Sequence, residues 1–148
     1  MHPPPANEEN AMAKVAISTR LPMSVDEVWK MIGRFNALSE WHPGVESSDL
    51  EDGGKVRRLA LVGGGEIVER LERIDDDDHV YRYTIESSPL PVANYVAEIR
   101  VQRAGEEGCT VEWSGDFEAS GAPEADATRV VRDIYTAGLD NLRKLYGG

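Results

Sequence analysis

The feature that most constrains the fold is one long amphipathic segment that follows a series of short β-like runs. From Glu124 to Tyr146, apolar residues recur at three- and four-residue spacings, which predicts a helix with a single apolar face. That face comprises Val130, Val131, Ile134, Leu139, Leu142 and Leu145. The segments before it are β-like runs separated by tight turns, which is typical of an antiparallel sheet. Because this is the one predicted helix long enough to cover the apolar face of such a sheet, we expect the two to pack together.

The order of the predicted elements defines the fold class. Strands are expected over residues 13–21, 45–51, 55–62, 66–74, 80–87, 93–103 and 109–120. Two short helices fall between the first and second strands, one beginning at Ser24 with Glu27 three residues later and one ending before Pro43. The sequence therefore predicts an α+β fold, in which a curved antiparallel seven-stranded sheet wraps around the long C-terminal helix.

Composition narrows the function classes. The chain has 148 residues, enough for one domain with a hydrophobic core, and we expect residues 13–148 to form it. The proline-rich start, residues 1–12, lacks the basic and apolar regions of a signal peptide and is predicted to be a flexible tail. A net charge of −11 disfavours nucleic acid and anionic membrane surfaces as partners. No apolar run reaches the length of a membrane span, so we expect a cytoplasmic protein. We expect it to be a monomer or a homodimer.

Metal and cysteine chemistry are also disfavoured. Cys109 is the only cysteine and lies in a predicted strand, so we expect a small buried thiol. His2 lies in the predicted tail, and no two of the three histidines have the spacing of metal ligands. The aspartates at 75–78 lack the glycine and glutamate of a calcium loop and are predicted to form a solvated turn. We therefore expect no metal and no cofactor.

Two charged residues are predicted to point toward the helix. Alternation along strand 55–62 places Arg57 on the same face as Leu59 and Leu61, and alternation along strand 66–74 places Glu69 on the same face as Ile67. If the glycines at 63–65 form a turn that sets Leu61 opposite Ile67, Arg57 and Glu69 become diagonal neighbours. A buried charge must be paired or hydrated, so these residues predict a partly polar interior.

Aromatic residues line successive strands on this same inward side. They are Tyr81, Tyr83, Tyr95, Trp113 and Phe117. A packed core is one interpretation of this pattern. The other is a wet cavity, because buried tyrosine hydroxyls need hydrogen-bond partners and an ordinary core would avoid Arg57 and Glu69.

The stretch SEWHPGVESS contains a further candidate, His42, beside Trp41. Metal ligation is the least favoured role for this histidine. A general base is possible because an imidazole titrates near neutrality, but the sequence offers no orienting partner nearby. The favoured interpretation is that Trp41 and His42 close one end of the pocket.

Five stretches of this chain resemble the START-like, or SRPBCC, helix-grip superfamily, and especially its polyketide cyclase/dehydrase-like branch. They are VDEVWKMIGRFNALSEWHPGV, VRRLALVGGGEIVERLERID, YRYTIESSPLPVANYVAEIRV, VEWSGDF and IYTAGLDNL. The resemblance covers roughly residues 13–146 and implies a deep hydrophobic pocket between the sheet and the C-terminal helix. It does not determine the chemistry, since relatives include aromatase/cyclases, carriers of lipids or hormones, and regulators.

Two functional hypotheses follow. In the first, the pocket binds a small hydrophobic molecule such as a polyketide, lipid or aromatic metabolite. In the second, the protein is a cyclase or dehydratase in which Glu69 or His42 transfers protons while Arg57 or a tyrosine stabilises an enolate. The residues predicted to contact or orient the ligand are Trp41, Arg57, Leu59, Tyr81, Tyr83, Tyr95, Trp113, Phe117, Ile134 and Tyr135.

Overall fold

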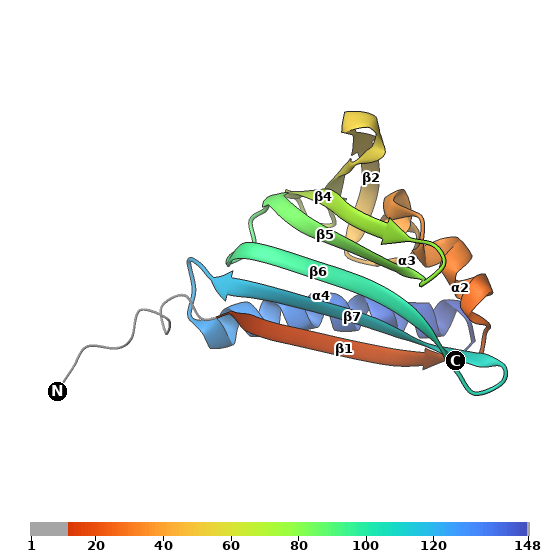
Figure 1. Cartoon of the computed structure of the whole chain (residues 1–148). Coiled ribbons are helices and arrows are strands. Elements are labelled where there is room, and N and C mark those ends of the chain that lie inside the picture. The colour runs from red at the N-terminus through yellow and green to blue at the C-terminus, as the bar shows by residue number, and fades with distance from the viewer. Residues whose placement is uncertain (1–11, 148) are drawn as a thin grey trace.

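The computed structural model describes residues 12–147, and Figure 1 shows the whole chain as a ribbon. Its strands are Ala13–Leu21 (β1), Val45–Glu51 (β2), Val56–Leu61 (β3), Glu66–Asp75 (β4), Val80–Ser87 (β5), Val92–Ala104 (β6) and Gly108–Ala119 (β7). Its helices are Val25–Ile32 (α2), Leu38–Trp41 (α3) and Glu124–Leu145 (α4), with 3₁₀ turns at Phe35–Ala37 (η1) and Asp52–Gly54 (η2). The predicted tail lies outside the described residues, apart from Met12.

The strands form one antiparallel sheet in the order β1-β7-β6-β5-β4-β3-β2. Each strand from β2 to β6 pairs with the next along the chain, and β1 pairs with β7 at the edge of the sheet, with Ala13 opposite Phe117. The sheet curves, and α4 runs along its concave face (Figure 1). This arrangement confirms the predicted helix-grip architecture, including the short helices between the first and second strands. No helix within residues 12–147 is long and apolar enough to cross a membrane.

The helix α4 presents a narrow stripe of side chains to the sheet. The buried residues of this stripe are Ala127, Val131, Tyr135, Gly138, Leu139 and Leu142. The predicted face extended too far, because Leu145 at the end of the helix is 50% exposed. Acidic residues occupy the first turn of the helix and Arg143 and Lys144 the last turn, which complements the helix dipole.

The predicted helix start at Ser24 is present in α2. The Ser24 hydroxyl accepts a hydrogen bond from the backbone N–H of Glu27 at 3.2 Å, so one unpaired donor of the first turn is satisfied. The Trp29 indole Nε1 donates to Asp76 at 2.9 Å, which ties α2 to the turn between β4 and β5. Within that turn, Asp75 accepts the backbone N–H of residues 77 and 78, so its carboxylate organises the turn. Residues 12–147 contain no group of three side chains arranged to hold a metal ion.

The register between β3 and β4 differs from the predicted one by two residues. Leu59 lies opposite Ile67, and Arg57 lies directly opposite Glu69 rather than diagonal to it. The turn is centred on Gly63 rather than Gly64, because Leu61 N–H donates to Gly65 O at 3.0 Å and the three glycines adopt positive φ. The same side chains still point inward, because side-chain direction alternates with a period of two and the register shifts by two residues.

Candidate functional site

A pocket of about 380 Å³ lies between the concave face of the sheet and α4. The α3–β2 connection, the β3–β4 hairpin, strands β5 to β7 and the middle of α4 all contribute to its wall. The residues that line it are Leu38, His42, Gly44, Val45, Leu59, Leu61, Val62, Ile67, Glu69, Tyr83, Ile85, Leu90, Tyr95, Trp113, Val130, Asp133 and Ile134. The lining is therefore mostly apolar, with a few polar groups in defined places.

The structure divides the predicted site residues into two layers. Those that line the pocket are His42, Leu59, Glu69, Tyr83, Tyr95, Trp113 and Ile134. Those that lie buried outside the lining are Trp41, Arg57, Tyr81, Phe117 and Tyr135. Sequence reasoning did not place Leu38, Gly44, Val45, Leu90 or Asp133 in the pocket. The loop positions among them carry no periodic signal, whereas Asp133 adjoins Ile134 on the predicted helix.

The centre of the site is a buried ion pair between Arg57 and Glu69. Arg57 is fully buried and Glu69 is 5% exposed. Arg57 Nε donates to Glu69 Oε1 at 2.8 Å, and Nη2 lies 2.7 Å from the same oxygen without hydrogen-bond geometry. Arg57 Nη1 donates to the backbone oxygen of Phe35 at 2.6 Å and to the hydroxyl of Tyr81 at 3.3 Å. The guanidinium also lies 4.2 Å from the centroid of the Phe35 ring, a cation–π contact.

Burial acts on both members of this pair. Burial raises the pKa of Glu69, and the neighbouring Arg57 offsets part of that rise. Burial alone would lower the pKa of Arg57, but the nearby Tyr81 and Glu69 outweigh it and the pKa is raised. A guanidinium stays protonated in proteins, so a neutral Glu69 would leave a buried charge without its partner. The pair is therefore best described as ionised.

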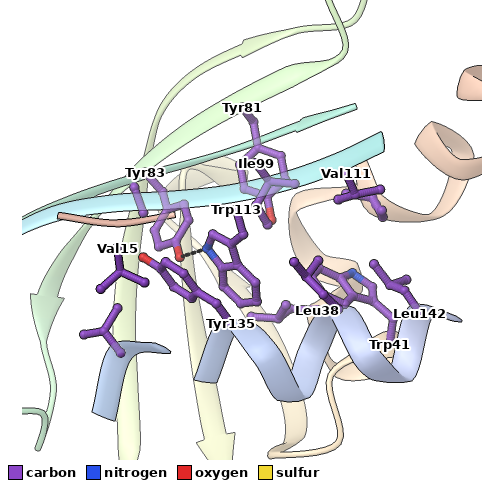
Figure 2. Close-up of a cluster of buried hydrophobic side chains, with 14 of the residues drawn as sticks. Val15, Leu38, Trp41, Tyr81, Tyr83, Ile99, Val111, Trp113, Tyr135 and Leu142 are labelled. Carbon is purple, nitrogen blue, oxygen red and sulfur yellow. Dashed lines mark hydrogen bonds between the residues drawn. The ribbon is translucent and has the colours of Figure 1, made fainter. Parts of the chain in front are cut away.

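Hydrogen bonds link three tyrosines and a tryptophan across the sheet and α4. Trp113 Nε1 donates to the Tyr83 hydroxyl at 3.0 Å, the bond drawn in Figure 2. The Tyr83 hydroxyl lies 3.2 Å from that of Tyr95, which in turn is hydrogen-bonded to Tyr135. Figure 2 shows Tyr135 reaching up from α4 toward Trp113, and their rings stack with centroids 4.4 Å apart. Burial raises the pKa of all three tyrosines, so their hydroxyls remain protonated at neutral pH.

His42 connects the α3–β2 loop to α4. Its Nδ1 accepts the backbone N–H of Gly44 at 3.0 Å, so the proton must lie on Nε2, which donates to the backbone oxygen of Ile134 at 2.7 Å. Burial lowers the pKa of His42, and the hydrogen bond to the backbone oxygen of Ile134 acts against that shift. Both ring nitrogens are therefore engaged, and the neutral imidazole acts as a structural link at the pocket wall.

Replacing His42 by glutamine is expected to flatten the dependence of stability on pH. Because the folded pKa of His42 is lowered, the unfolded chain binds the proton more readily, so stability falls as the pH drops below about 6.5. Glutamine cannot take up this proton, yet its amide can still donate and accept. Denaturant unfolding at pH 8 and pH 5 should show a larger loss for the wild type than for the variant. Equal losses would contradict this role for the buried imidazole.

The family described as polyketide cyclase/dehydrase and lipid transport matches residues 12–147. This chain belongs to that family. Its membership and fold confirm the START-like resemblance predicted from the sequence. A search of curated proteins found no match.

Several solved structures share the fold. The protein XoxI from Bacillus cereus is 38% identical, with a TM-score of 0.89 over 90% of this chain and 95% of that one. A START superfamily protein from Mycobacterium smegmatis is 10% identical, with a TM-score of 0.75 over 90% and 97% of the two chains. The Zhui aromatase/cyclase from a Streptomyces species is 17% identical, with a TM-score of 0.75 over 92% and 94%. The last two identities are low, so those likenesses concern the fold alone.

Proposed function

We propose that this protein binds a small hydrophobic molecule in the pocket between the sheet and α4. The observation that carries the proposal is the pocket itself, whose volume of about 380 Å³ falls within the range of small-molecule sites. Its wall is mostly aliphatic and aromatic, so a ligand would gain roughly 25 cal/mol for each Å² of apolar surface buried, less the costs of ordering. The family description, which includes lipid transport, supports the same conclusion.

In this proposal the two layers of residues have different roles. Leu59, Trp113 and Ile134 contact the apolar body of the ligand, while Glu69, Tyr83 and Tyr95 face its polar end. The residues outside the lining, Trp41, Arg57, Tyr81, Phe117 and Tyr135, hold these groups in position. Native mass spectrometry of the protein from its own host, followed by extraction, would identify a bound molecule.

Replacing Ile134 by tryptophan is expected to weaken binding of an aromatic probe, 2-naphthol, by at least about tenfold. The indole would occupy space in the pocket that the ligand needs. The matched control is Ile74→Trp, the same change at a residue of β4 that is 40% exposed and does not line the pocket. Isothermal titration calorimetry should find unchanged affinity for the control. Similar affinity for both variants, or no binding by the wild type, would contradict the proposal.

A catalytic role in the same pocket is the second hypothesis from the sequence. The hydrogen bonds of His42 argue against its use as a base, because neither ring nitrogen is free to take a proton from a ligand. Glu69 is the better candidate, since it lines the pocket and burial raises its pKa. Its ion pair with Arg57 opposes protonation, however, so we favour binding over proton transfer.

A further inference from the structure

We propose that the occupant of this pocket is an uncharged alcohol or phenol, whose hydroxyl group donates to Glu69 and accepts from a tyrosine, and that carboxylates are excluded. The inference rests on the proposed function, since it specifies the chemistry of the bound molecule. It is carried by three observations: a carboxylate oxygen without a partner, the signs of the charges in the wall, and a surplus hydroxyl proton.

The first observation concerns the second oxygen of Glu69. Oε1 receives both contacts from Arg57, which lies outside the lining, while Glu69 itself lines the pocket. No hydrogen bond among the described residues reaches Oε2, and this oxygen is not among the fully buried atoms that lack a partner, so it is open to the pocket. A charged oxygen in a mostly apolar wall needs a donor, so Oε2 favours a ligand that brings one. A ligand O–H can supply it.

The second observation is the sign of the charges that face the ligand. The charged side chains of the lining are Glu69 at the inner end and Asp133, an exposed residue of α4, at the rim. The wall contains neither lysine nor arginine, and the Arg57 guanidinium is already committed to Glu69, Phe35 and Tyr81. A ligand carboxylate would lose its hydration without gaining a cationic partner and would lie close to Glu69.

The third observation is a count of hydrogens in the tyrosine network. Trp113 Nε1 and the hydroxyls of Tyr83, Tyr95 and Tyr135 supply four donor hydrogens, but three hydrogen bonds join these groups. One hydroxyl hydrogen is therefore left over. Either oxygen can donate in the two bonds between tyrosines, and two of the three possible arrangements leave the spare hydrogen on Tyr83 or Tyr95, which both line the pocket.

Together these groups match a hydroxyl rather than other polar ends. Glu69 lies opposite Ile85, and Tyr83 lies two residues from Ile85 on the same face of β5. The acceptor and the donor are thus diagonal neighbours, within reach of one ligand group. A hydroxyl both donates and accepts, whereas an ether cannot donate, an ammonium cannot accept, and a carboxylate does neither favourably here.

The experiment is a calorimetric titration of the native chain with three probes of one ring system: 2-naphthol, 2-methoxynaphthalene and 2-naphthoate. Naphthol should bind about tenfold or more tightly than either of the others, because a hydrogen bond to a charged group contributes about that factor. The comparison needs no substitution, so it does not depend on a variant that folds. Equal binding of naphthol and naphthoate would overturn this inference alone. Failure of all three probes to bind would overturn the proposed function as well.

A pair of double variants tests whether Glu69 is the cause. Arg57→Met with Glu69→Leu removes the ion pair and the acceptor together, and should reduce the preference for naphthol over methoxynaphthalene to less than about threefold. The control is Arg58→Met with Glu66→Leu, which removes an exposed ion pair between the same two strands. The control should keep the full preference. An undiminished preference in the first variant would overturn the role of Glu69.

Discussion

Replacing Arg57 by methionine is expected to lower the free energy of unfolding by about 3–5 kcal/mol at pH 7. The substitution leaves the carboxylate of Glu69 buried without a counter-ion and removes the donor to the backbone oxygen of Phe35. The pKa of Glu69, already raised by burial, should rise further. A raised folded pKa gives stability that is lost as the pH rises through it, so the deficit should shrink on acidification. Urea unfolding at pH 7 and pH 5 measures both effects.

The control for this prediction is the neighbouring residue. Arg58 points to the other face of β3 and pairs with Glu51 and Glu66, which are both partly exposed. Arg58→Met should therefore lower the free energy of unfolding far less than Arg57→Met, because exposed ion pairs contribute little to stability. The double variant Arg57→Met with Glu69→Leu should recover most of the stability, because no unpaired charge remains. If Arg57→Met costs no more than Arg58→Met, the buried pair does not stabilise the fold as described.

The fold was predictable because each helix and strand is indicated by a pattern of residues within its own segment of the sequence. Strand alternation assigned Arg57, Glu69 and the inward aromatic residues to the correct face, and the buried thiol of Cys109 followed from its strand. The register of β3 against β4 differs from the predicted one by two residues, since Ile67 lies opposite Leu59 rather than Leu61. Strand periodicity determines a face but not where a glycine turn is centred, because each of the three glycines can adopt positive φ.

The pocket was less predictable, because its wall depends on how far α4 stands from the sheet. At Gly138 the helix lies very close to the aromatic core, since an added Cβ would come within 2.7 Å of His42 and 2.9 Å of Trp113. Farther toward its N-terminus, α4 leaves room beside Val130 and Ile134 for the pocket. The periodicity of apolar residues does not depend on the distance between the helix and the sheet. The sequence therefore could not separate Trp113, which lines the pocket, from Trp41, which does not.

Replacing Trp41 by alanine is expected to lower the free energy of unfolding by about 3–5 kcal/mol. The indole of Trp41 is 1% exposed and packs edge-on against Trp113, with ring centroids 5.6 Å apart. The backbone oxygen of Trp41 accepts a hydrogen bond from the Asn141 side chain of α4 at 2.9 Å. A Cβ added at Gly138 of α4 would lie 3.0 Å from the Trp41 ring, so the helix backbone lies close to the indole. Because the helix is already in close contact, it cannot move inward to fill the cavity that the substitution leaves. Denaturant unfolding measures the loss.

A conservative variant separates packing from polarity at this position. The Nε1 of Trp41 is buried and has no hydrogen-bond partner within the described residues. Trp41→Phe should therefore lower the free energy of unfolding by less than half as much as Trp41→Ala, because phenylalanine fills most of the space of the indole and removes an unsatisfied donor.

The binding of 2-naphthol separates the roles of the two tryptophans. Trp113→Phe loses the hydrogen bond to Tyr83 and alters the pocket wall, so it should weaken this binding. Trp41→Phe should leave the binding unchanged, because Trp41 does not line the pocket. Equal effects of the two phenylalanine variants on affinity would contradict the assignment of Trp41 to the layer outside the pocket.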